Sequence, residues 1–130
     1  MRHSLVLGIL LMVAATLPLT TAAQPTQKYN PYTNQWETVQ PSSTLQYNPY
    51  NNTWGYAAPN AAPQYNPYQN QWNVAPPNYV PKYNPYNNKW ETASPNSQPQ
   101  YNPYSNTYQY VPPGVKPVYN PYTGKWEYPK

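Results

Sequence analysis

One eight-residue unit recurs six times in this chain at an unvarying interval. Tyr-Asn-Pro-Tyr begins every 18 residues from Tyr29 to Tyr119, and each copy ends in Trp or Tyr. The copies occupy residues 29–36, 47–54, 65–72, 83–90, 101–108 and 119–126. A fixed period without insertions predicts a repeat architecture in which every unit adopts the same conformation.

Each unit is predicted to form the tip of a β-hairpin. In the first copy, Asn30 and Pro31 suit the first two positions of a type I turn, and the Asn30 side chain can accept a hydrogen bond from the backbone two residues on. Such a loop needs a residue with positive φ before the return strand, and Asn34 has that place. The later copies have only Asn or Gly there, the residues that adopt positive φ most readily.

In this register the first Tyr and the last aromatic residue of each unit face each other. The predicted pairs are Tyr29–Trp36, Tyr47–Trp54, Tyr65–Trp72, Tyr83–Trp90, Tyr101–Tyr108 and Tyr119–Trp126. An aromatic pair of this kind contributes roughly 0.5–1.5 kcal/mol beyond the area that it buries. Lys28 then lies opposite Glu37, and Lys82 opposite Glu91, so opposite charges also favour this register.

The composition argues against a core shared by the units. Beyond residue 23 the aliphatic side chains larger than Ala are Val39, Leu45, Val74, Val80, Val111, Val115 and Val118. Ordering the backbone costs roughly 1–2 kcal/mol per residue, which so few aliphatic residues cannot offset. Pro makes up 20 of the 130 residues and lies in every segment between units, where it favours extended polyproline II conformation.

We therefore expect residues 24–130 to be a largely disordered, low-complexity tandem repeat. Six short β-hairpins would lie on Pro-rich linkers without a shared globular core. A β-solenoid is the ordered alternative, because six copies in phase suit a stacked array. The aromatic clusters and the Pro content fit that alternative less well.

Residues 1–23 have the pattern of a secretory signal peptide. Arg2 and His3 give a positive start, Leu5 to Val13 is apolar, and small residues precede Gln24. The apolar stretch is shorter than the ~20 residues that span a bilayer. The sequence thus predicts a secreted, extracellular or periplasmic protein without a transmembrane span after cleavage.

The residue inventory predicts a non-enzymatic protein with no cofactor and no metal site. The only Arg and the only His lie in the segment that would be cleaved, and Asp and Cys are absent from the chain. General acid–base and nucleophilic catalysis draw mainly on those residue types, and so do zinc sites. The remaining charge is a modest excess of Lys over Glu, so we expect no specific nucleic-acid partner.

Exposed aromatic rings are the chemistry that this chain offers. The second Tyr of each unit has no predicted partner within its hairpin, and these residues are the candidate contact aromatics: Tyr32, Tyr50, Tyr68, Tyr86, Tyr104 and Tyr122. Six linked weak sites favour a structural, matrix or cell-surface role through multivalent contacts with an envelope or matrix polymer, or through self-association. The alternative is binding of carbohydrate or another cell-wall polymer by aromatic stacking.

Two local resemblances accompany these patterns. The last unit, YNPYTGKW at 119–126, resembles the loop of minimal β-hairpins derived from the immunoglobulin-binding domain of protein G, which implies a hairpin and carries no function. The repeat units are also similar to YNPYTG-type segments of bacterial envelope and secreted proteins. That similarity covers the repeat units only.

Overall fold

The computed structural model describes residue 16 and residues 23–130, and its regular structure consists of strands in antiparallel pairs. The strands are β1 (Thr26–Asn30), β2 (Gln35–Val39), β3 (Thr44–Asn48), β4 (Thr53–Ala57), β5 (Ala62–Asn66), β6 (Gln71–Ala75), β7 (Val80–Asn84), β8 (Lys89–Ala93), β9 (Gln98–Asn102), β10 (Thr107–Val111), β11 (Val118–Asn120) and β12 (Lys125–Glu127). The predicted signal peptide lies outside the described residues, apart from Thr16 and Ala23. Among the residues described, no helix is long and apolar enough to cross a membrane.

The six hairpins and their register are those that the sequence predicts. Tyr29 lies opposite Trp36 and Lys28 opposite Glu37, and the equivalent pairs recur in the other hairpins. The Asn30 side chain accepts a hydrogen bond from the Tyr32 amide at 3.0 Å. The φ angles at the position of Asn34 are 54° to 57° for Asn and 69° for Gly124. Local turn chemistry therefore sets each hairpin.

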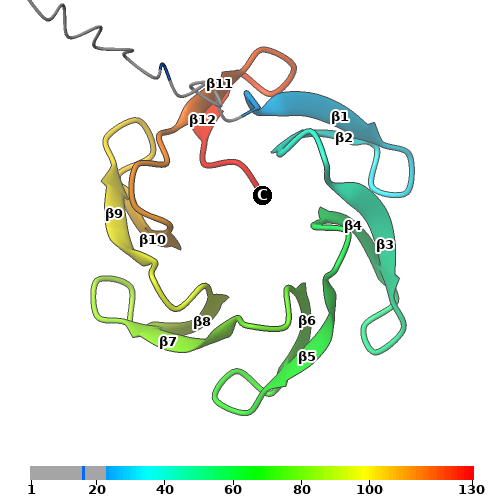
Figure 1. Ribbon diagram of the computed structural model, residues 1–130, viewed down its shortest axis with the longest axis vertical. Helices are drawn as coiled ribbons and strands as arrows, with labels where there is room; N and C mark the ends of the chain where they lie inside the picture. The colour runs from blue at the N-terminus through cyan, green and yellow to red at the C-terminus, as the bar shows by residue number, and fades with distance from the viewer. Residues whose placement is uncertain (1–15, 17–22) are drawn as a thin grey trace, which may run out of the picture.

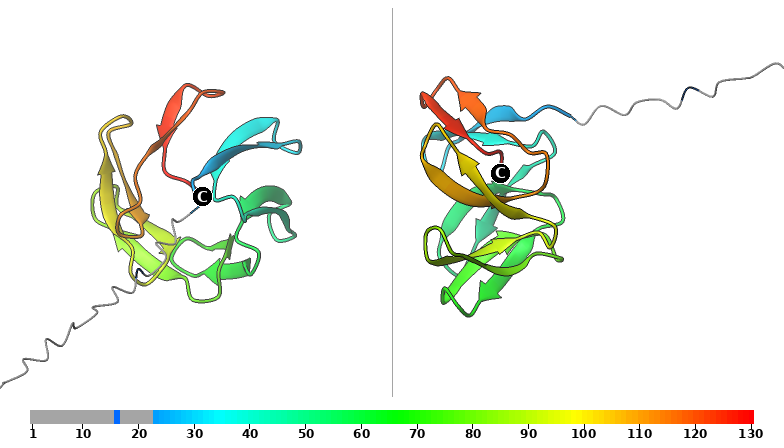
Figure 2. Two further views of the ribbon diagram at one scale, coloured as in Figure 1. Left: turned by 45° about the horizontal axis from the view of Figure 1, so that its top comes forward. Right: turned by 90° about the vertical axis from the view of Figure 1, so that its left-hand side faces the viewer.

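The hairpins are arranged side by side in a ring (Figure 1). Their tips lie at the periphery, and the chain follows the circumference from β1 to β12 until the last hairpin lies beside the first. Figure 2 shows the ring obliquely and from one side, with the hairpins in a single tier. Each hairpin is a separate two-stranded sheet, so the ring is held by contacts between hairpins and not by one continuous ladder.

Small and branched residues near the ends of the inner strands form the buried apolar contacts of the ring. Val39 is fully buried, and Ala75, Ala93 and Val111 are no more than 5% exposed. These four residues share one phase of the 18-residue repeat. A narrow ring of repeated small side chains thus takes the place of a large aliphatic core.

Each linker contains a tight turn whose phase also repeats. Backbone amides donate to carbonyls three residues earlier, as from Ser43 to Gln40 at 3.0 Å and from Ser97 to Ser94 at 3.0 Å. The residue before the first Tyr of a hairpin donates hydrogen bonds to the linker that follows that hairpin. Lys28 donates to the carbonyls of Pro41 and Ser43, both at 2.7 Å, and its ammonium lies 5.7 Å from the centre of the Tyr56 ring.

The ion pairs predicted from the register are wrong, although the register is right. Lys82, like Lys28, donates to linker carbonyls, here those of Pro95 and Ser97. Glu37 instead lies 3.1 Å from the ammonium of Lys130, the one ion pair among residues 23–130. The lysine stem is long enough to reach past the opposite carboxylate, and a pair of linker carbonyls gives its ammonium two acceptors.

The arrangement of the hairpins also differs from the expected chain of independent units. Neighbouring hairpins contact each other around the whole ring, and the linkers adopt defined turns. The β-solenoid is not formed, since strands of different hairpins are not hydrogen-bonded neighbours. The physical reason is that stacking and side-chain amides join the hairpins, so aliphatic residues are not required in large number.

Candidate functional site

The outer edge of the ring has three aromatic residues at every junction between hairpins. We call this set the aromatic rim. It consists of the strand tyrosines Tyr29, Tyr47, Tyr65, Tyr83, Tyr101 and Tyr119, their partners Trp36, Trp54, Trp72, Trp90, Tyr108 and Trp126, and the loop tyrosines Tyr32, Tyr50, Tyr68, Tyr86, Tyr104 and Tyr122.

Within a hairpin the two strand rings are tilted against each other. Their centroids are 5.1–5.6 Å apart and their planes meet at 40° to 54°. In five hairpins the strand tyrosine also donates its hydroxyl to the Asn with positive φ, as Tyr29 does to Asn34 at 3.0 Å. Gly124 offers no such acceptor in the sixth hairpin. These contacts fix the orientation of the strand rings.

The loop tyrosines have partners, contrary to the expectation from the sequence, and the partner lies on the next hairpin. Tyr32 is stacked on Trp54, Tyr50 on Trp72, and so on around the ring, with centroids 3.7–4.3 Å apart and planes within 12° of parallel. Tyr122 completes the series on Trp36. Each junction thus has one stacked and one tilted pair that share a ring.

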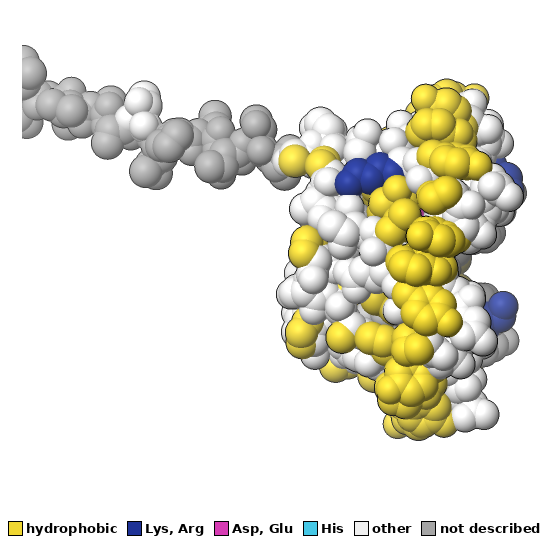
Figure 3. Space-filling view, turned by 90° about the vertical axis from the view of Figure 1, so that its right-hand side faces the viewer, with side chains coloured by type: hydrophobic (Ala, Val, Ile, Leu, Met, Phe, Trp, Pro, Cys, Tyr) yellow, Lys and Arg dark blue, Asp and Glu magenta, His cyan; other side chains and the backbone are white. Residues whose placement is uncertain are grey.

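The rim remains accessible despite this stacking. The loop tyrosines are 58–61% exposed, because each covers its neighbour with one face only. The strand tyrosines are 42–47% exposed. Figure 3 shows the result as a continuous band of hydrophobic side chains along the circumference. A band of this extent on a small protein is unusual unless it contacts something.

The Asn of the Tyr-Asn-Pro-Tyr motif joins one hairpin to the next. All six are 0–3% exposed, although Asn is normally a surface residue. The amide of Asn84, for example, donates to the Tyr108 carbonyl at 3.1 Å and to the Glu91 carboxylate at 3.0 Å, while its oxygen accepts from the Tyr86 amide. Every hydrogen-bonding atom of a buried amide must find a partner, so this side chain fixes the position of the adjacent hairpin.

The third hairpin satisfies the same requirement with different residues. Asn73 replaces the carboxylate there, and Asn66 donates to the side-chain oxygen of Gln69 at 3.0 Å and to the Thr92 hydroxyl at 3.3 Å. Sequence reasoning assigned this Asn to the turn alone. The signal for its second role is that six copies have Asn while the residue two positions after Pro varies.

Pockets recur at these junctions, which we call seams and number by the hairpins that they join. Those at seams 2/3, 3/4, 5/6 and 6/1 have volumes of about 250, 450, 540 and 320 Å³. Their walls use the same repeat positions: the residue after the loop Tyr, the first residues of the return strand, and the Trp with its neighbours on the next hairpin. The pockets are therefore equivalent by repeat, although their side chains differ.

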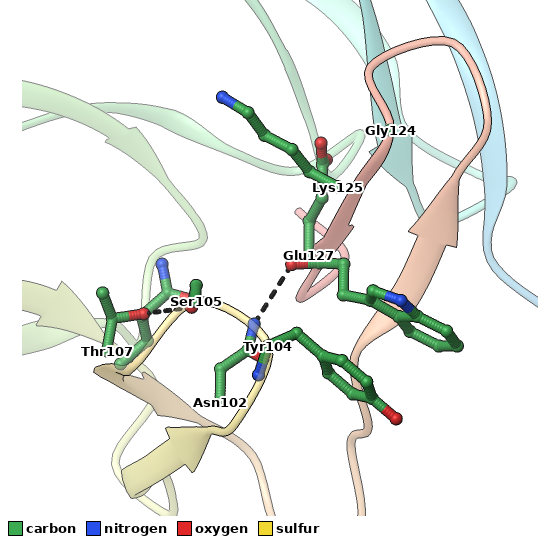
Figure 4. Close-up of a pocket in the computed structure, with 9 residues that line it drawn as sticks. Asn102, Tyr104, Ser105, Thr107, Gly124, Lys125 and Glu127 are labelled. Atoms are coloured by element: carbon green, nitrogen blue, oxygen red, sulfur yellow. Dashed lines mark hydrogen bonds between the residues drawn. The ribbon is translucent and has the colours of Figure 1, made fainter.

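The pocket at seam 5/6 combines hydroxyl, amide and charged groups beside the rim (Figure 4). Ser105 and Thr107 line one wall and share a 2.6 Å hydrogen bond, and Lys125 and Glu127 line the opposite wall from β12. The Tyr104 ring points away from these polar groups toward the rim. Such a site offers hydrogen-bond donors and acceptors but no nucleophile held by a base.

One ionisable group of the ring has a perturbed affinity for protons. Burial raises the pKa of Tyr128, whose hydroxyl donates to the Tyr101 carbonyl at 3.3 Å. Tyr56 and Tyr110 have the same place in the repeat and make the same bond to the preceding hairpin. Burial of the side chain explains this shift, so it does not mark a reactive group.

Comparison with known proteins identifies no relative of this chain. No protein-family model matches the chain, and neither a curated protein nor a solved structure is similar to it. The candidate site therefore rests on the geometry of this ring alone.

Proposed function

We propose that the chain is a secreted, non-enzymatic repeat protein with a structural, matrix or cell-surface role, which it performs through multivalent contacts of the aromatic rim. The observation that carries the proposal is the repetition of one exposed aromatic group six times on one circumference. The signal-peptide pattern at residues 1–23 supports action outside the cytoplasm.

The expected affinity of the rim for its partner comes from multivalency. One aromatic contact is weak, but linked sites that engage together raise overall binding by roughly 10²–10⁴-fold. A closed ring fixes the distances between its sites, so less conformational entropy is lost on binding than with the same sites on a flexible chain. The partner that suits such a ring is an extended polymer or a surface with repeated contact points.

The test is retention of the purified protein by envelope and matrix fractions. Loop tyrosines are replaced by Leu at two, four and then six hairpins, with circular dichroism to confirm that the hairpins persist. We expect the retained fraction of the protein to fall by more than the fraction of loop tyrosines that is removed. Asn60→Ala with Asn78→Ala, at exposed linker positions, is the matched control. Retention that is unchanged in the six-fold variant would contradict the proposal.

Carbohydrate binding is the second candidate, and the seam pockets favour it. They place amide and hydroxyl side chains directly beside exposed rings. Apolar faces of sugars pack against aromatic rings, while their hydroxyl groups need donors and acceptors in a fixed arrangement. Titration with soluble polysaccharides, followed by intrinsic Trp fluorescence, distinguishes this candidate from a purely aromatic contact.

A further inference from the structure

We infer that the seam pockets are subsites for single neutral sugar residues, and that the pocket at seam 5/6 has the most room for one. This inference rests on the proposed multivalent binding function and names its ligand. It differs from stacking on the rim alone, because it places the specificity in the polar walls behind the rim.

The shared chemistry of the seams points to an uncharged ligand. Seam 2/3 has Asn51, Thr53 and Asn73 in its walls and no charged side chain, whereas seam 5/6 has Lys125 and Glu127. Neutral hydrogen-bonding groups are thus present at both seams, whereas of these two seams only seam 5/6 has charged side chains. A ligand with many hydroxyl groups satisfies both, because each hydroxyl donates and accepts.

The pocket at seam 5/6 has small residues at three repeat positions in its walls. Gly124, Ser105 and Thr107 stand where seam 3/4 has Asn88, Gln69 and Gln71. A Cβ added at Gly124 would meet no atom within 4 Å. Its volume of about 540 Å³ lies within the roughly 300–1,000 Å³ typical of small-molecule sites and exceeds the volumes of the pockets at seams 2/3, 3/4 and 6/1.

The opposite wall supplies the groups that would orient a sugar. Lys125 and Glu127 alternate on β12 with one residue between them, so both lie on the same face of the strand. A carboxylate accepts hydrogen bonds from two hydroxyl groups, and an ammonium donates to others. The Thr123 hydroxyl donates to one carboxylate oxygen of Glu127 at 3.1 Å, and the second oxygen accepts no hydrogen bond from the residues 23–130 that the structure describes.

The chain provides its own reporter for this pocket. Trp126 lines it, and the fifth hairpin shows that Tyr is accommodated at the equivalent position, where Tyr108 stands. The variant Trp36→Tyr, Trp54→Tyr, Trp72→Tyr and Trp90→Tyr therefore leaves Trp126 as the single Trp of the full chain. Its fluorescence is titrated with neutral gluco-, manno- and galacto-oligosaccharides and with oligomers of N-acetylglucosamine.

We expect a saturable change in Trp126 fluorescence with at least one of these sugars, at an affinity that changes little with salt. Ser105→Leu with Thr107→Leu fills part of the pocket and removes both hydroxyl groups from its wall, and should weaken binding at least tenfold. Thr33→Ser, at seam 1/2, is the control that should leave the titration unchanged. Glu127→Gln should weaken binding several-fold, because a neutral amide replaces the carboxylate as acceptor.

The remaining outcomes overturn the inference. No saturable change with any of the sugars excludes the pocket as a sugar subsite, and so does a titration that the filled variant does not weaken. Binding of these neutral sugars that salt abolishes would mean that the neutral groups of the walls do not hold the ligand, and it also contradicts the inference. Retention of the filled variant on envelope or matrix fractions separates the two proposals: if retention persists, the rim function stands without the pocket, and if retention is absent from the parent protein as well, both fail.

Discussion

Five seams of the ring join hairpins that are consecutive in the chain, and the sixth joins the last hairpin to the first. The aromatic and amide contacts are the same at both kinds of seam. Asn120 donates to the Trp36 carbonyl at 3.0 Å and Tyr122 is stacked on Trp36, as their counterparts are at the other seams except 3/4, where the stack is kept but Asn66 donates to the Thr92 hydroxyl. The ring therefore closes through the same kinds of contact that join consecutive hairpins. The stacking at the closing seam does not require a linker between the two hairpins.

The closing seam differs from the other five seams because the C-terminal segment takes the place of a linker. The C-terminal segment lies along the first hairpin, where the Lys130 amide donates to the Thr38 carbonyl at 3.0 Å and the Gln40 amide donates to the Lys130 carbonyl at 3.1 Å. Gln27 donates to the Tyr119 carbonyl, a bond that Tyr56, Tyr110 and Tyr128 make at other seams. At the closing seam, a short backbone pairing and one ion pair thus stand where the other five seams have a covalent linker.

The largest expected effect comes from the buried amides. Asn84→Leu leaves the Tyr108 carbonyl and the Tyr86 amide without their partner, at a cost of about 1–3 kcal/mol for each group. Asn120→Leu removes the same bonds at the closing seam, where no linker holds the neighbours together, and should cost more. Chemical denaturation followed by Trp fluorescence measures both. Equal effects would show that the closing seam is no weaker than the others.

Removal of a stacked ring should have a smaller effect. Tyr50→Ala and Tyr122→Ala each lose an aromatic pair worth roughly 0.5–1.5 kcal/mol, and the area that the ring covers on its Trp. Near-ultraviolet circular dichroism should show the loss of one stacked pair in each variant. A spectrum unchanged by Tyr122→Ala would show that the first and last hairpins are not in contact in solution.

The turn of the sixth hairpin allows a stabilising change. Gly124 has the φ that Asn adopts in the other five hairpins, and Gly124→Asn would give the Tyr119 hydroxyl the acceptor that it lacks. This bond and the loss of unfolded-state freedom oppose the strain that a side chain meets at positive φ, so we expect a net gain of at most about 0.4–1 kcal/mol in the free energy of unfolding. The reverse change, Asn70→Gly, is the matched variant and should destabilise. A loss of stability in Gly124→Asn would contradict the proposed equivalence of the hairpins.

The ion pair at the closing seam should contribute least. The Lys130 side chain is 62% exposed, so solvent screens its attraction to Glu37 and the pair is worth at most about 1 kcal/mol. Lys130→Ala should lower the melting temperature slightly at low salt and not at high salt. An effect that persists at high salt would mean that the backbone pairing of the tail, and not its charge, had been disturbed.

The sequence was sufficient for the backbone conformation and strand register of each hairpin. The turn at Asn30 and Pro31, the positive φ at Asn34 and the facing of Tyr29 and Trp36 follow from local backbone preferences. These features are set over eight residues, where few alternative conformations compete. For the same reason the register was predictable in all six hairpins.

Contacts between units could not be predicted in the same way. Tyr32 finds its partner 22 residues away in the chain, and nothing in its own hairpin indicates Trp54. The paucity of aliphatic residues led to the expectation of independent hairpins, because stacked rings and buried amides were not counted as a means of association. The unbroken 18-residue spacing was the available signal, since independent hairpins would tolerate linkers of different length.

Closure through identical junctions has a consequence for how such a gene can change. Recombination between near-identical segments adds or removes whole units in frame, and an open array tolerates either event. In a closed ring, one unit more or fewer changes the angle that every junction must adopt, so the ends meet only if all the junctions adjust together. Closure therefore constrains the number of units more tightly than an open array would.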